Sequence, residues 1–163
     1  MKSFFILLIS QAIFAIAAAQ LKTSAVCPMI NVDILAGRVN DIEPLSTQGQ
    51  VKKSLPCFTS EEPENNTSSC GGGIFYKDKD IYFYTGRDYI EIREKFNGKL
   101  SLPLMGASRN SLFKTLGHPK IKDVRWDAFR TQYGTLILYY NKANKINKIQ
   151  FSNKSTETLT LCN

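Results

Sequence analysis

The chain of 163 residues is 43% hydrophobic and carries a formal net charge of +7. This length suffices for one ordinary domain with a sizeable core, or for two small repeats, and it excludes an assembly of several full-sized domains. Four cysteines and a single histidine further restrict the chemistry that the chain could perform.

The first 19 residues have the features of a secretory signal peptide. Lys2 gives a short positive region, an apolar run extends from Phe4 to Ile16, and Ala17-Ala18-Ala19 forms a small-residue cleavage site. The alternative is a transmembrane anchor, but Ser10-Gln11 interrupts the run, which falls short of the roughly 20 apolar residues that a span needs. We therefore expect a signal peptide over residues 1–19 and a secreted or periplasmic mature chain without a membrane span.

The basic charge is concentrated in the C-terminal half. Ten Lys/Arg and two Asp/Glu lie between Arg109 and Lys154, whereas nine Lys/Arg and ten Asp/Glu lie between Gly37 and Leu100. Such asymmetry is typical of a protein with an anionic partner. For an exported chain we expect an acidic protein rather than nucleic acid, with an anionic lipid surface or an acidic glycan as alternatives. A basic face that only keeps the protein in solution explains the charge equally well.

The four cysteines predict disulfide bonds, because an even number of cysteines in an exported protein usually pairs. Three pairings are possible, and we predict Cys57–Cys70 together with Cys27–Cys162. The first would close a polar loop with no apolar content of its own, and the second would join the two ends of the domain. No CxxC motif is present, which argues against a redox or zinc-ribbon site.

Beyond the lead-in at residues 20–36, the chain has the pattern of two similar units, at residues 37–99 and 100–163. Each begins with Pro-Leu and continues with a short helical pattern, over Ser46–Leu55 in the first unit and Ser108–Leu116 in the second. Pro56 ends the first helical pattern, and Gly117-His118-Pro119 ends the second.

Apolar residues then alternate with polar ones, as in antiparallel strands with one wet face. The predicted strands are Gly73–Lys77, Ile81–Tyr84, Tyr89–Phe96, Trp126–Tyr133, Leu136–Tyr140 and Ile146–Phe151, with a last strand-like run at Thr156–Leu161. The predicted fold class is α+β: two tandem helix–loop–antiparallel-sheet units, packed together and linked by disulfides.

The second unit resembles a known small repeat. Its pattern consists of Gly106, Leu116-Gly117-His118-Pro119, Trp126, Phe129, Leu136–Tyr140 and Lys145–Gln150. It is similar to the α/β repeat of the beta-lactamase inhibitor protein family and of the SmpA/OmlA-type outer-membrane assembly lipoproteins. The tandem arrangement and a cysteine pair in the loop of the first unit are also similar to the inhibitor proteins. The resemblance implies this fold and a protein-binding role, and it assigns no target.

The sequence offers little for catalysis. His118, between Gly117 and Pro119, is typical of a turn, and Cys57 or Cys70 with this histidine would be the only nucleophile–base pair. Glu91 and Glu94 could serve a glycosidase, but an alternating strand would place them on opposite faces. No zinc, calcium or nucleotide motif is present in the sequence. We predict a chain without catalytic residues, metal or cofactor, and keep a carboxylate-based hydrolase as a minor alternative.

Tyrosines in and beside the strands are the better candidates for function. Tyrosine on an exposed sheet face gives a large contact area at low entropic cost, although alternate aromatic residues can also fill a core. We assign Phe83, Phe96, Trp126 and Phe151 to the core. The predicted binding residues are Tyr82, Tyr84, Arg87, Tyr89, Arg130, Tyr133 and Tyr139. The predicted function is protein binding, by an inhibitor or immunity protein or by an envelope assembly module.

Overall fold

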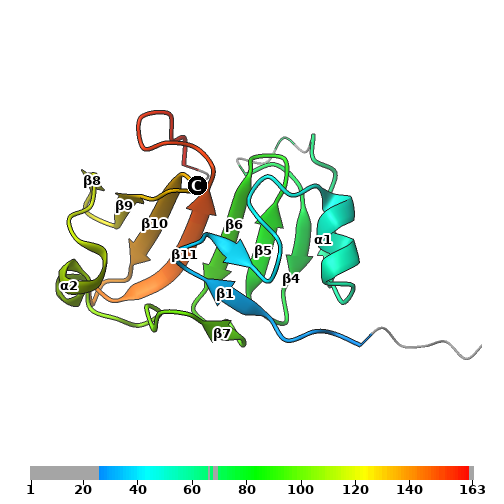
Figure 1. Cartoon of the computed structure of the whole chain (residues 1–163), viewed down its shortest axis with the longest axis horizontal. Helices are drawn as coiled ribbons and strands as arrows, with labels where there is room; N and C mark the ends of the chain where they lie inside the picture. Colours follow the sequence, from blue (N-terminus) through cyan, green and yellow to red (C-terminus); the bar gives the residue numbers. More distant parts are fainter. Residues whose placement is uncertain (1–25, 66, 68–69, 162–163) are drawn as a thin grey trace, which may run out of the picture.

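The computed structural model describes residues 26–65, 67 and 70–161 (Figure 1). The predicted signal peptide and Cys162 lie outside the described residues. In the part of the chain that is described, no helix is long and apolar enough to cross a membrane.

An eight-stranded antiparallel sheet forms the body of the molecule (Figure 1). Its strands, in spatial order, are β3 (Ser60–Glu61), β4 (Ile74–Tyr76), β5 (Ile81–Tyr84), β6 (Tyr89–Arg93), β11 (Ile146–Ser152), β10 (Thr135–Tyr140), β9 (Trp126–Arg130) and β8 (Ile121–Lys122). The first four strands form one meander and the last four form a second. The two meanders join through the last strand of each, because β6 pairs with β11.

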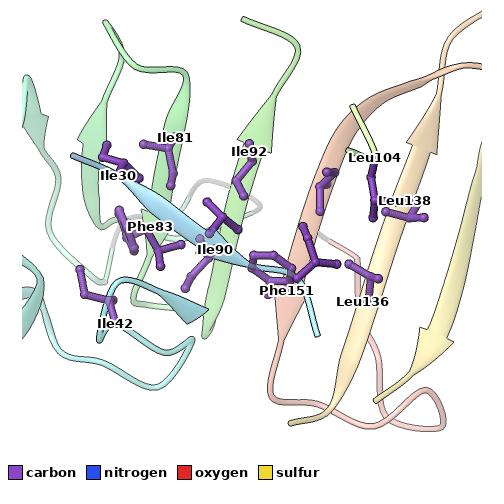
Figure 2. Close-up of a cluster of buried hydrophobic side chains, with 14 of the residues drawn as sticks. Ile30, Ile42, Ile81, Phe83, Ile90, Ile92, Leu104, Leu136, Leu138 and Phe151 are labelled. Atoms are coloured by element: carbon purple, nitrogen blue, oxygen red, sulfur yellow. The ribbon is translucent and has the colours of Figure 1, made fainter. Parts of the chain in front are cut away.

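The register of the β6–β11 pair makes the core continuous across this junction. Ile90 lies opposite Phe151, and Ile92 lies opposite Ile149. Because side chains alternate between the two faces of a strand, these residues lie on one face together with the apolar side chains of the neighbouring strands. Figure 2 shows this cluster extending from Phe83 on one side of the junction to Leu136 on the other.

A second, smaller sheet covers the apolar face. It consists of β2 (Arg38–Val39), β1 (Asn31–Asp33) and β7 (Lys99–Leu100), and β1 runs antiparallel to β2 but parallel to β7. Ile30, Val32, Ile34 and Val39 from this region are at most 5% exposed and belong to the main core. The lead-in of the chain is thus part of the fold, because it supplies the cover that the large sheet needs.

The first predicted helix is present as α1 (Gln48–Ser54), which begins with a capping box. The Thr47 side chain accepts a hydrogen bond from Gln50 N, and the Gln50 side chain accepts one from Thr47 N at 2.8 Å. Val51 and Leu55 are buried, as their spacing of four predicts.

The second predicted helix is shorter than its pattern indicates. It consists of a 3-10 turn, η1 (Arg109–Ser111), and a single turn of α-helix, α2 (Phe113–Leu116), which ends at Gly117 with φ of 73°. Ser108 makes no capping hydrogen bond through its side chain.

The predicted α+β fold class is wrong, since the chain is mostly β. Within the described residues, helix is confined to α1, η1 and α2, whereas the chain forms eleven strands. Helices of four and seven residues are too short to cover an eight-stranded sheet, so β1, β2, β7 and their loops cover it instead. The run Thr156–Leu161 forms no strand over its described residues.

The predicted disulfide pairing is also wrong. Cys27 bonds to Cys57, with 5.6 Å between their Cα atoms, and this bond is incompatible with both predicted pairs. Cys70 is disulfide-bonded as well. The polar loop that was expected to need its own disulfide is held by backbone hydrogen bonds: Thr59 N donates to Phe75 O at 2.8 Å, and Glu62 N donates to Gly73 O at 2.9 Å.

The run Gly71–Gly73 has a packing role rather than a flexible one. A Cβ at Gly72 would lie 1.8 Å from Pro63 O, and a Cβ at Gly73 would lie 1.8 Å from Phe83 O. Only glycine lets the chain pass this closely to the backbone of both neighbours. These residues therefore allow β4 to begin between the polar loop and β5.

Candidate functional site

The face of the large sheet opposite the main core carries the side chains that alternate with the core residues along each strand. We call it the tyrosine face. It is formed by Phe75, Tyr82, Tyr84, Tyr89, Glu91, Arg93, Trp126, Ala128, Arg130, Thr135, Ile137, Tyr139, Lys148, Gln150 and Ser152. The small sheet packs against the opposite face.

The C-terminal segment 153–161 covers one end of the tyrosine face. Tyr89 donates through its hydroxyl to Thr160 O at 2.7 Å, and Leu159 and Leu161 pack against a buried group that includes Tyr89 and Ile137. This segment accounts for the burial of Tyr89, which is only 3% exposed. The opposite end of the face, around Arg93 and Lys148, keeps its cations partly exposed, at 42% and 26% of their side chains.

A buried carboxylate lies at the centre of the tyrosine face. The Glu91 side chain is 2% exposed and accepts hydrogen bonds from Arg93 Nε on one oxygen and from Gln150 Nε2 on the other. Lys148 Nζ lies 3.5 Å from the second oxygen. Gln150 in turn accepts a hydrogen bond from the Tyr139 hydroxyl at 2.9 Å. Because each carboxylate oxygen has a partner, the charge is compensated although it is removed from water.

Aromatic rings hold the two cations in place. The guanidinium carbon of Arg93 lies 4.0 Å from the centre of the Tyr82 ring, and Lys148 Nζ lies 4.0 Å from the centre of the Tyr139 ring. Arg93 also donates to the Tyr84 hydroxyl at 3.2 Å. Burial, with a smaller contribution from the charge of Glu91, raises the pKa of Tyr84 to about 12. These side chains are therefore preorganised before any partner arrives.

A hollow of about 480 Å³ lies beside this group, at the uncovered end of the face. It is lined by Asp80, Arg93, Glu94, Lys95, Arg125, Tyr139, Tyr140, Asn147 and Lys148. Asp80 is already engaged, since its carboxylate accepts from Lys95 N at 2.8 Å and from the Tyr82 hydroxyl at 3.2 Å.

The structure places three of the predicted binding residues together. Tyr82, Tyr84 and Tyr139 lie on the tyrosine face, each partly exposed. Tyr89 lies on this face but under the C-terminal segment. Arg130 is exposed at the end of β9 on the same face.

Two of the predicted binding residues, Tyr133 and Arg87, do not lie on the tyrosine face. Tyr133 is on the core side, where its ring packs edge-on against Phe151 at 5.9 Å and its hydroxyl donates to Ile34 O at 3.3 Å. Arg87 is exposed in the β5–β6 turn. Among the predicted core residues, Phe83 and Phe151 are fully buried and Phe96 is partly buried, whereas Trp126 is partly buried on the tyrosine face instead of in the main core.

Sequence reasoning missed the charged part of this site. Glu91, Arg93, Lys148 and Gln150 were not among the predicted binding residues. The alternation within Tyr89–Arg93 places Glu91 and Arg93 on the same face, but only the β6–β11 pairing brings Lys148 opposite Arg93 and Gln150 opposite Glu91.

A second ion network lies on the core side and has a structural role. Arg109 pairs with both oxygens of Asp127, which is 3% exposed, and the Tyr140 hydroxyl donates to the same carboxylate at 2.8 Å. Arg109 also donates to Asp123 O at 2.6 Å. These bonds fix η1 against β9 and β10.

The residues considered for catalysis are dispersed. His118 is exposed, and its ring lies 4.2 Å from the ring of Phe113. Glu91 is engaged by the cations of the tyrosine face, and Glu94 is exposed beyond the end of β6. Among the described residues, no three His, Cys, Asp or Glu side chains are grouped as a metal site would need.

Comparison of the chain with protein-family models, with curated proteins and with solved structures finds no match. The resemblance of the second unit to the inhibitor and assembly-lipoprotein repeats therefore stays a prediction from its motif.

Proposed function

We propose that the mature chain is a secreted, non-enzymatic protein-binding module that uses the uncovered end of the tyrosine face to bind an acidic protein. The observation that carries this proposal is the arrangement of Tyr82, Tyr84 and Tyr139 around two partly exposed cations, Arg93 and Lys148. Tyrosine and arginine are the residues that most often dominate binding energy at protein interfaces.

The preorganisation of these side chains supports the proposal. A side chain that is ordered on binding costs about 0.5–1.5 kcal/mol. Arg93 is held by Glu91, Tyr82 and Tyr84, and Lys148 is held by Glu91 and Tyr139. Much of this cost has therefore already been met in the unbound protein.

The charge of the chain favours an acidic partner. Removal of Lys2 with the signal peptide would lower the formal charge from +7 to +6, and most of the excess lies in the second half of the chain. Opposite potentials accelerate the encounter and exclude like-charged competitors. An inhibitor or immunity protein acting on a secreted enzyme or toxin is the most specific form of this function.

The test is affinity capture from the secreted or periplasmic fraction, followed by mass spectrometry, with three immobilised versions of the mature chain. The wild type and a Lys53→Glu control on exposed α1 should retain the same specific partner. The third version, Tyr82→Ala, should lose it, because the Tyr82 ring packs against Arg93 at the uncovered end of the tyrosine face. A partner retained equally by all versions would contradict the proposed surface.

A further inference from the structure

Resting on the proposed function, we infer that the hollow beside Arg93 and Lys148 binds an extended acidic peptide segment of the partner protein. The hollow is lined by cations from separate segments of the chain. Some of their N–H groups form no hydrogen bond to the described residues. Its volume of about 480 Å³ lies in the range of roughly 300–1,000 Å³ that is typical of ligand sites.

The first argument is the number of available donors. A guanidinium group has five N–H donors and an ammonium group has three. Arg93 uses Nε for Glu91 and Nη2 for Tyr84, so among the described residues Nη1 is left for a ligand. Over the same residues Lys148 forms one ion pair, with Glu91. The buried carboxylate therefore fixes both cations without using all of their N–H groups.

The second argument is the charge balance of the lining. Lys95, two residues after the end of β6, and Arg125, directly before β9, are exposed, and in the described part of the chain neither forms an ion pair. The lining has four cations against the two carboxylates of Asp80 and Glu94. The lining keeps an excess of positive charge even when Glu91 is counted as a third carboxylate.

The third argument distinguishes a peptide from an acidic glycan. The carboxylates of Asp80 and Glu94 interrupt the basic lining, so a uniformly sulfated chain would meet repulsion. A peptide can place neutral residues beside them. The partly exposed amide of Asn147 also lines the hollow and can both donate to and accept from a peptide backbone.

The experiment measures binding of a fluorescein-labelled tetraglutamate peptide to the full mature chain by fluorescence polarisation. Matched probes are tetraglutamine, which has the same length without charge, and a heparin oligosaccharide. The test variants are Lys95→Glu and Arg125→Glu, and the control is Lys114→Glu, an exposed site on α2 with the same change of charge. Circular dichroism confirms that each variant is folded.

We expect the wild type to bind tetraglutamate in a salt-dependent manner, and tetraglutamine not at all. Each test variant should weaken binding by roughly fivefold to tenfold, as expected when one exposed charge contact is reversed from attraction to repulsion, while Lys114→Glu leaves it unchanged. Equal weakening by the control would overturn the inference, because binding would then depend on overall charge. Binding of heparin but not of tetraglutamate would also overturn it.

The variants separate this inference from the proposed function. A partner that is lost with Tyr82→Ala but retained with Arg125→Glu would overturn the acidic-peptide site and leave the function intact. Site-dependent binding of tetraglutamate without any captured partner would support the peptide site and count against the function.

Discussion

At the scale of single residues, the most informative group is the Glu91 carboxylate, a buried charge beside two partly exposed cations. A buried ion pair is weak evidence for stability, because desolvation opposes the attraction between the charges. Its clearer effect here is geometric, since it fixes Arg93 and Lys148 beside the hollow. The carboxylate therefore organises the site rather than contacting a ligand itself.

Replacing this carboxylate tests how strongly the network is coupled. Glu91→Ala should lower the free energy of unfolding by about 3 kcal/mol, because removing one partner of a buried pair leaves the others uncompensated. Urea denaturation monitored by circular dichroism measures this change. Glu94→Ala, at an exposed neighbouring site, should change stability by less than about 0.5 kcal/mol. Equal effects of the two substitutions would show that Glu91 is not a coupled buried charge.

At the scale of elements, β4 is the strand that depends most on its local sequence. Its three residues are all buried, between β5 and the short β3. Gly73 precedes it at a point where a side chain would collide with the backbone of Phe83.

Adding a methyl group by Gly→Ala substitution should therefore change the stability of the protein in opposite directions at two glycines. Gly73→Ala should destabilise the protein by about 3 kcal/mol or more, because backbone must move to relieve the clash. Gly49→Ala should stabilise it by about 0.5–1 kcal/mol, since Gly49 lies inside α1 and its Cβ would have no neighbour closer than 3.9 Å. Thermal unfolding of the two variants measures the difference. A neutral Gly73→Ala would show that this crossing is looser than the structure indicates.

Sequence alone locates the longer elements. The alternation predicts strands over Ile81–Tyr84 and Leu136–Tyr140, and the spacing of Val51 and Leu55 predicts α1. Two-residue strands have no periodicity to detect, and each exists only through its pairing, as β7 does by pairing with β1. The sequence pattern at Ser108–Leu116 overestimates the length of the second helix, since the structure has only one turn of α-helix there.

The candidate site was predictable only where local alternation within one strand determines it. Tyr82 and Tyr84 follow from alternation within one strand. The proximity of Arg93 to Lys148 depends on a pairing between strands that are more than 50 residues apart in the chain, and no local pattern encodes it. The cysteine pairing failed similarly, because it depends on where the lead-in packs.

At the scale of the whole molecule, two features hold distant parts together: the β6–β11 pair between the meanders, and the Cys27–Cys57 bond between the lead-in and the segment after α1. This bond spans 30 residues and ties the chain just before β1, the central strand of the small sheet, to the segment that leads into the first meander. It therefore restrains the part of the chain that covers the core.

The double substitution Cys27→Ser, Cys57→Ser should lower the free energy of unfolding by about 3–4 kcal/mol in the loop-entropy account of disulfides. Denaturation of the variant and wild type without reductant measures this loss. Proteolysis and mass spectrometry of the unreduced wild type should recover a peptide pair containing Cys27 and Cys57. Recovery of Cys57 linked to Cys70 would contradict the structure.

The large sheet ends on both sides in strands of only two residues, β3 and β8, and these strands carry the charged residues Glu61 and Lys122. Short, charged edges offer few unpaired backbone groups to a strand from another molecule. Growth of the sheet by edge-to-edge pairing is therefore disfavoured, which protects the chain from fibrillar self-association. At the large sheet, we therefore expect a partner to bind through side chains on a face rather than through backbone groups at an edge.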